Sequence, residues 1–161
     1  MKEKIKENIS FIFCVALGFF NCVFFALPYL TSFATLKHTG FSVMLDWWGE
    51  GFVGVMCSLL QIFALVCSAF MIILGVFGMM KVFEGYKGLG RIDNKKIAKI
   101  SLLALAVINV LLLVFLIILV SSLPTNADLG YELSAGIYLS CSFSVVLTIA
   151  LLFLEKRFKK K

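Results

Sequence analysis

The sequence predicts an all-α protein, an antiparallel four-helix transmembrane bundle with its N- and C-termini in the cytoplasm. Hydrophobic residues make up 61% of the 161 residues and charged residues only 15%, whereas about a quarter of a soluble domain is charged. Four apolar segments, each long enough to cross a hydrocarbon core of ~30 Å, lie at about 9–33, 51–82, 96–122 and 131–154. The third observation, the distribution of basic residues between the loops, orients this bundle.

The basic residues lie almost entirely on one side of the predicted bundle. Three precede the first span, six lie in the connection between the second and third spans or at the span ends that flank it, and five follow the fourth, which leaves only Lys37 for the other side. Positive residues are retained in the cytoplasm, so both termini and the connection between spans two and three are expected inside. Because these residues sit at helix ends, the net charge of +6 predicts contact with membrane lipids and no binding of nucleic acid.

No linker and no internal repeat interrupts the four segments, so we predict a single polytopic membrane domain over residues 1–161. The first segment also has features of a cleaved signal peptide, since a basic start and an apolar run lead to Ser32-Phe33-Ala34. That run is longer than the ~7–15 apolar residues usual in a signal peptide, and Pro28 and Tyr29 precede the cleavage site. We therefore favour an uncleaved first span.

The second segment is expected to form one long helix with two unlike faces. At 100° per residue its small and polar residues share one side, and five large apolar residues, four of them Phe, share the other. Lipid accepts the Phe side, whereas small residues let neighbouring helices approach closely. The predicted helix-packing residues are Gly54, Ser58, Ser68 and Gly75 in this segment, and Gly136 in the fourth.

Residues 34–50 form the larger outer loop and end in Asp46-Trp47-Trp48-Gly49-Glu50. Tryptophans next to a membrane span are typical interfacial anchors, whose rings lie at the depth of the lipid headgroups. We assign this role to Trp47 and Trp48. The alternative is an aromatic platform that binds a ligand.

The sequence argues against several classes of enzyme and transporter. No ionisable residue lies in the middle of a predicted span, although proton-coupled transporters, including the four-span multidrug transporters with their embedded glutamate, depend on one. The five cysteines form no Cys-x-x-Cys pair, and the glycine-rich segment 83–91 lacks the Gly-Lys-Ser/Thr ending of a phosphate-binding loop. His38 is the only histidine. We predict no catalytic residue, metal site or cofactor.

Polar side chains at a similar depth in all four spans predict a polar layer near the membrane midplane. Counting ~1.5 Å per residue from the span ends places three amides, those of Asn21, Gln61 and Asn109, at this level, together with Ser140 and Ser144. Such a layer can hold helices together, at about 0.6 kcal/mol for each hydrogen bond. It can also form a binding site for a polar or lipid-like ligand, and both roles stay open.

Three functions remain compatible with the sequence. The first is a non-enzymatic interaction or structural subunit of a membrane assembly, which binds a membrane-protein partner or a second copy of itself through small-residue faces. The second is a channel-, holin- or transporter-like protein without proton coupling, and the third is a membrane enzyme acting on lipid or a thiol. We favour the first, and the Phe-, Ile- and Lys-rich composition suits the plasma membrane of a bacterium, its inner or cytoplasmic membrane.

Overall fold

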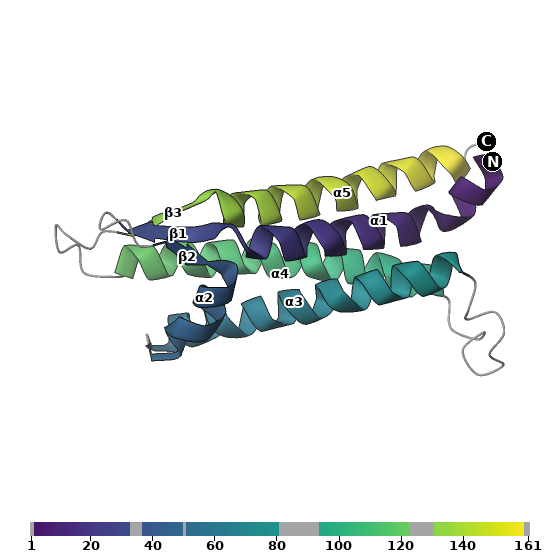
Figure 1. The fold of residues 1–161 in the computed structure, drawn as a ribbon. Helices are drawn as coiled ribbons and strands as arrows, with labels where there is room; N and C mark the ends of the chain where they lie inside the picture. The colour runs from purple at the N-terminus through teal and green to yellow at the C-terminus, as the bar shows by residue number, and fades with distance from the viewer. Residues whose placement is uncertain (1, 33–36, 50, 81–93, 123–130, 160–161) are drawn as a thin grey trace.

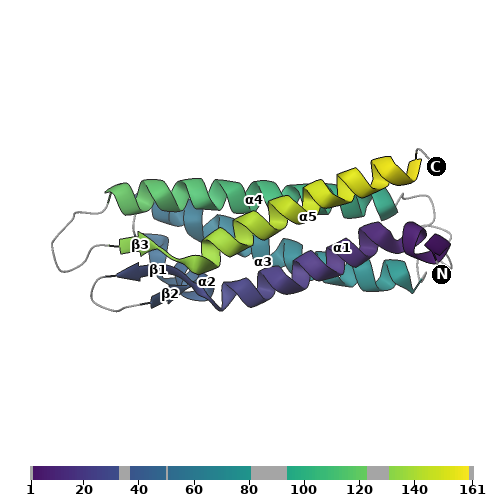
Figure 2. The ribbon, with the colours of Figure 1, turned by 90° about the horizontal axis from the view of Figure 1, so that it is seen from above.

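The computed structural model describes residues 2–32, 37–49, 51–80, 94–122 and 131–159. Four long helices run side by side along the molecule (Figures 1 and 2). Both chain termini lie at one end of it, together with the end of the second long helix and the start of the third (Figure 1). The long helices are α1 (Lys2–Phe25), α3 (Gly51–Met79), α4 (Asn94–Ser122) and α5 (Ala135–Lys159).

Each long helix contains a stretch that is long and apolar enough to cross a membrane. These stretches are Asn8–Phe25, Gly51–Met79, Lys96–Ser122 and Ala135–Leu154. The prediction of four segments able to span a membrane is therefore confirmed for the described residues, and the chain has the character of a multi-pass membrane protein. The glycine-rich segment 83–91 lies outside the described residues, as do Phe33 and Ala34 of the alternative signal-peptide site.

The first and fourth spans are shorter than predicted, because strands replace one end of each. Helix α1 closes with two tight turns, in which the amides of Ala26 and Leu27 donate to carbonyls only three residues back. Pro28 then lacks the amide hydrogen that a further helical turn would use. Residues Pro28–Ser32 form strand β1 instead, and Tyr131–Leu133 form strand β3 ahead of α5.

These strands belong to a small sheet, so the prediction of an all-α fold was wrong in this part of a mostly helical chain. The sheet has the order β2-β1-β3, with β2 at Lys37–Thr39, and both pairings are antiparallel. Leu30 of the central strand pairs with His38 on one side and Leu133 on the other. The sheet lies at the end of the molecule opposite the chain termini, beside α4 (Figure 1).

The predicted outer loop is also folded. Its described part contains β2, helix α2 (Gly40–Asp46) and a 3-10 turn, η1 (Trp47–Gly49). Thr39 caps α2, because its hydroxyl oxygen accepts the amide hydrogen of Ser42 at 3.3 Å. The hydroxyl of Ser58 on α3 donates to the carbonyl of Val43 at 3.1 Å, which holds α2 against the long helix.

The four spans differ in length, and the sheet and α2 compensate for the difference. The apolar stretches of α1 and α5 have 18 and 20 residues, whereas those of α3 and α4 have 29 and 27. At ~1.5 Å per residue, the longer pair extends ~10–15 Å beyond the shorter pair. A buried cluster fills this region, where residues of α3 and α4 pack against Tyr29, Val43 and Trp47.

Helices α1 and α3 approach each other most closely where glycines remove the side chain. A Cβ atom added at Gly75 would lie 2.7 Å from the carbonyl oxygen of Phe11, and one at Gly18 would lie 2.7 Å from that of Ser68. The backbones of the two helices are thus in direct contact. The opposite side of α3 carries Phe52, Phe63, Phe70 and Phe77, all of them exposed.

Candidate functional site

All five residues assigned to the polar layer are buried. The side chains of Asn21, Gln61, Asn109 and Ser144 are 0% exposed, and that of Ser140 is 1% exposed. They come from α1, α3, α4 and α5, so each long helix contributes to the interior of the bundle. An interior position in an apolar bundle requires hydrogen-bond partners, because an unpaired buried amide is costly.

All four long helices meet in a hydrogen-bond network around the two asparagines. The Asn109 amide nitrogen donates to the side-chain oxygen of Asn21 at 3.1 Å and to the Ser140 carbonyl at 3.4 Å. The Asn21 amide nitrogen in turn donates to the Ser68 hydroxyl at 2.8 Å, and this hydroxyl donates to the Ala64 carbonyl at 2.7 Å. The network therefore connects α4 to α1 and α5, and α1 to α3. Ser68, expected only at a packing contact, is a full member of it.

Tyr29 extends the network towards the sheet, and sequence reasoning missed it. Its hydroxyl is hydrogen-bonded to that of Ser140 at 2.8 Å, and its side chain is fully buried. Burial raises the pKa of Tyr29 to about 12, and the side-chain interactions with Ser140 and Gln61 oppose this shift only in part. The phenol is neutral at physiological pH. The one feature of the sequence that points to Tyr29 is its polar hydroxyl within an apolar run, directly after Pro28.

Gln61 lies beside the network without joining it. It approaches the Tyr29 hydroxyl closely enough to lower the pKa of that group, yet neither its nitrogen nor its oxygen reaches a partner at hydrogen-bonding geometry. Its amide nitrogen faces the backbone of α2, because a Cβ atom at Gly40 would lie 2.6 Å from it. The side-chain oxygen of Asn109 is also buried without a partner.

Ser144 does not connect to the other polar residues by its side chain. Its hydroxyl donates to the Cys141 carbonyl of the same helix at 2.9 Å. Its own carbonyl accepts the hydroxyl of Thr148 at 2.7 Å, and Thr148 also reaches the Leu102 carbonyl of α4 at 3.4 Å. Ser144 therefore serves as a small residue on the buried side of α5.

The predicted helix-packing residues contact different neighbours. Gly54 is buried on α3, and Gly75 lies against α1. Two others contact the outer elements: Ser58 bonds α2, and a Cβ atom at Gly136 would lie 2.6 Å from the Pro28 carbonyl oxygen of β1. The small-residue side of α3 is therefore used within this chain.

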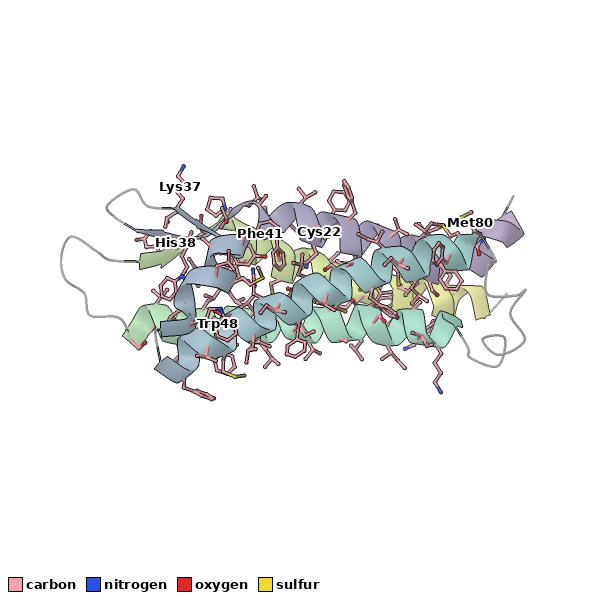
Figure 3. All side chains as sticks on the ribbon, turned by 60° about the horizontal axis from the view of Figure 1, so that its bottom comes forward. Cys22, Lys37, His38, Phe41, Trp48 and Met80 are labelled. Atoms are coloured by element: carbon pink, nitrogen blue, oxygen red, sulfur yellow. The ribbon has the colours of Figure 1, made fainter. Side chains whose placement is uncertain are left out.

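The two tryptophans have different environments. Trp48 is 45% exposed and donates its indole hydrogen to the Met44 carbonyl at 2.8 Å, and Figure 3 places it beside α3 near the sheet end. Trp47 is only 5% exposed, and its ring meets that of His38 edge to face, with centroids 5.7 Å apart. The role of Trp48 as an interfacial anchor stays a prediction, whereas the Trp47 ring packs inside the protein.

The arrangement offers neutral hydrogen-bond donors and acceptors inside an apolar bundle. Amides and hydroxyls of this kind can orient a neutral polar molecule or fasten helices together. Among the described residues, no group of three or more His, Cys, Asp or Glu side chains could hold a metal ion.

Comparisons with known proteins add no family. No protein-family model matches the chain, and neither the curated proteins nor the solved structures give a significant match. The class defined by the fold is that of a multi-pass membrane protein with four candidate spans.

Proposed function

We propose that the chain is a non-enzymatic subunit of a membrane assembly, with cytoplasmic termini and an antiparallel bundle in the plasma membrane of a bacterium. The basic residues that precede the first span and follow the last support this orientation, because both termini lie at one end of the molecule (Figure 1). The chemistry of the interior supports a non-enzymatic role, since its polar groups are amides and hydroxyls that are neutral at physiological pH. The partner is another membrane protein, bound through one of its transmembrane helices.

An apolar groove between α4 and α5 is the observation that carries this proposal. It has a volume of about 330 Å³ and faces the lipid side of the bundle. Two small residues, Ala106 and Thr148, are almost buried at its base, and larger side chains such as Val110 and Ile149 rise on its walls. Thr148 presents no polar surface there, because its hydroxyl donates within the protein. Small residues between larger ones are typical of close helix packing in membranes.

The test is purification of the tagged protein in mild detergent, with a groove-filling variant and a matched control. Val110→Phe enlarges a half-exposed groove residue, and Val66→Phe makes the same change on the lipid-facing side of α3, outside the groove. We expect a stoichiometric protein that is retained by the wild type and by Val66→Phe and reduced at least tenfold by Val110→Phe. Retention of only the tagged chain, as a homo-oligomer or a monomer, would count against the subunit function, and equal retention of a partner by both variants would exclude the groove.

A second function is a channel-like protein that passes a small polar solute without proton coupling. The connected groups of Asn21, Asn109, Ser140 and Tyr29 favour it, because they offer hydrogen bonds inside the membrane in place of water. The unpaired amide of Gln61 adds a donor and an acceptor nearby.

Solute flux into liposomes separates this function from the first. If the polar layer conducts, the double change Gln61→Leu and Asn109→Leu is expected to lower flux at least tenfold, because two polar contacts on the path are lost. The control is Ser144→Ala, since that hydroxyl bonds only its own helix. If the wild-type protein gives no more flux than empty liposomes, the channel function is excluded and the subunit function remains.

A further inference from the structure

Gln61 combines complete burial with an amide that the protein does not satisfy. Its side chain is 0% exposed, and both its nitrogen and its oxygen lack a hydrogen-bond partner. Buried polar groups in proteins are almost always paired with protein or with ordered water. An amide with both ends unpaired inside an apolar bundle would be strongly destabilising, so its presence demands a partner.

The surroundings of Gln61 supply polar groups on more than one side. The Tyr29 hydroxyl is near enough for a side-chain hydrogen-bond interaction with the amide to lower its pKa, although the contact does not reach full hydrogen-bond geometry. A Cβ atom at Gly40 would lie 2.6 Å from the Gln61 nitrogen and 2.9 Å from the Phe25 carbonyl oxygen. Both atoms therefore border the same glycine, and the carbonyl lies at the end of α1, where helical partners run out.

Asn21 shows what a satisfied amide looks like in the same interior. It is equally buried, but its nitrogen donates to Ser68 and its oxygen accepts from Asn109. Of the two amides, only that of Gln61 has neither end at full hydrogen-bond geometry with the protein.

We propose that Gln61 binds a water molecule within the bundle, between α3, the start of α2 and Tyr29. The ligand must both donate and accept, because the amide offers both kinds of group, and water does so in the smallest volume. The tight approach of Gly40 leaves no room on that side for a larger molecule. A buried water typically makes about three hydrogen bonds to such groups. This hydration site is independent of the subunit function, since it lies inside the chain and away from the α4–α5 groove.

The experiment uses the wild-type protein in lipid nanodiscs and exploits one property of the sequence. Gln61 is the only glutamine, so labelling glutamine side chains with ¹⁵N gives a single amide pair in the NMR spectrum. We expect cross-relaxation between these amide protons and water, and exchange of the amide in deuterated buffer. The internal control is Asn21, labelled in a separate sample and assigned with Asn21→Leu, whose amide is expected to exchange at least tenfold more slowly.

Each outcome decides the proposal. Cross-peaks to water at Gln61 that are absent at Asn21 support a bound water. A Gln61 amide without a cross-peak to water overturns the proposal, and a cross-peak to the Tyr29 hydroxyl in its place would indicate a direct protein partner. Equal cross-peaks at Gln61 and Asn21 would also overturn it, because they would report general wetting of the bundle.

Discussion

Gly75→Leu is expected to force α1 away from α3 and to destabilise the protein more than any other single change considered. The first carbon of the new side chain would meet the Phe11 carbonyl oxygen at 2.7 Å and a methyl group of Val15 at 2.6 Å. The helix backbone cannot yield as a flexible side chain does, so the helices must separate along their contact. Overpacking of this kind costs about 3 kcal/mol, which corresponds to a fall in Tm of about 6–12 °C for a protein of this size.

The measurement is thermal unfolding in detergent, followed by size-exclusion chromatography. Ala69→Leu is the matched control, because residue 69 lies on the same helix with its side chain exposed. The control is expected to keep the wild-type Tm to within about 2 °C, since a surface change has a small effect. A wild-type Tm for Gly75→Leu would mean that α1 and α3 are not in backbone contact.

Asn109→Leu is expected to destabilise the bundle by about 2–3 kcal/mol, near the upper end of the range for a buried polar group left unpaired. The change removes the donor to the Asn21 oxygen and the donor to the Ser140 carbonyl. Hydrogen bonds in membrane bundles average only about 0.6 kcal/mol. The larger value is expected because two acceptors on two helices lose their donor at once.

A double-mutant cycle with Asn21→Leu measures this coupling by chemical denaturation in detergent. The Asn21 change removes the acceptor, while Ser68 still donates to the Ala64 carbonyl. We expect the double variant to lose at least about 1 kcal/mol less than the sum of the single changes, because the partners act as a unit. Strict additivity would contradict the bond between the two asparagines. Ser144→Ala, whose hydroxyl bonds its own helix, is expected to change stability by less than about 0.5 kcal/mol.

The membrane-spanning segments and the buried side of α3 were predictable from the sequence, because hydropathy and periodicity act locally. Residue spacing alone put Gly75 on the small-residue side, and this side is buried. The same argument did not identify Gly18 as a packing residue, because it is a single glycine among large apolar residues. Its importance depends on the partner surface, since it lies against the Ser68 carbonyl of another helix.

Counting depth along the spans was informative for only part of the polar layer. It placed Asn21, Asn109 and Ser140 at one level, and the structure joins these three. For Gln61 the count began at the start of the second segment, which extends beyond the shorter spans. Gln61 therefore lies under α2, and Ser68, seven residues further along α3, bonds Asn21.

The sheet could not be predicted because its strands are short and distant in sequence. Residues Pro28–Ser32 lie within an apolar run that hydropathy assigns to the first span. Their strand partners are three residues each, too short for an alternating pattern to be visible. The burial of Trp47 depends on tertiary contacts in the same way. The sequence pattern of two tryptophans beside a span is the same whether one ring or both face the lipid.

The central position of β1 in the sheet has a consequence for biosynthesis. A ribosome delivers the strand early, but one of its two partners, β3, emerges only after α4 has been made. The hydroxyl partner of Tyr29 arrives later still, 111 residues along the chain. Until then one edge of β1 and the hydroxyl of Tyr29 lack their partners. Unpaired strand edges of this kind promote aggregation of nascent chains. The last elements to be synthesised, β3 and α5, are thus the ones that complete the fold.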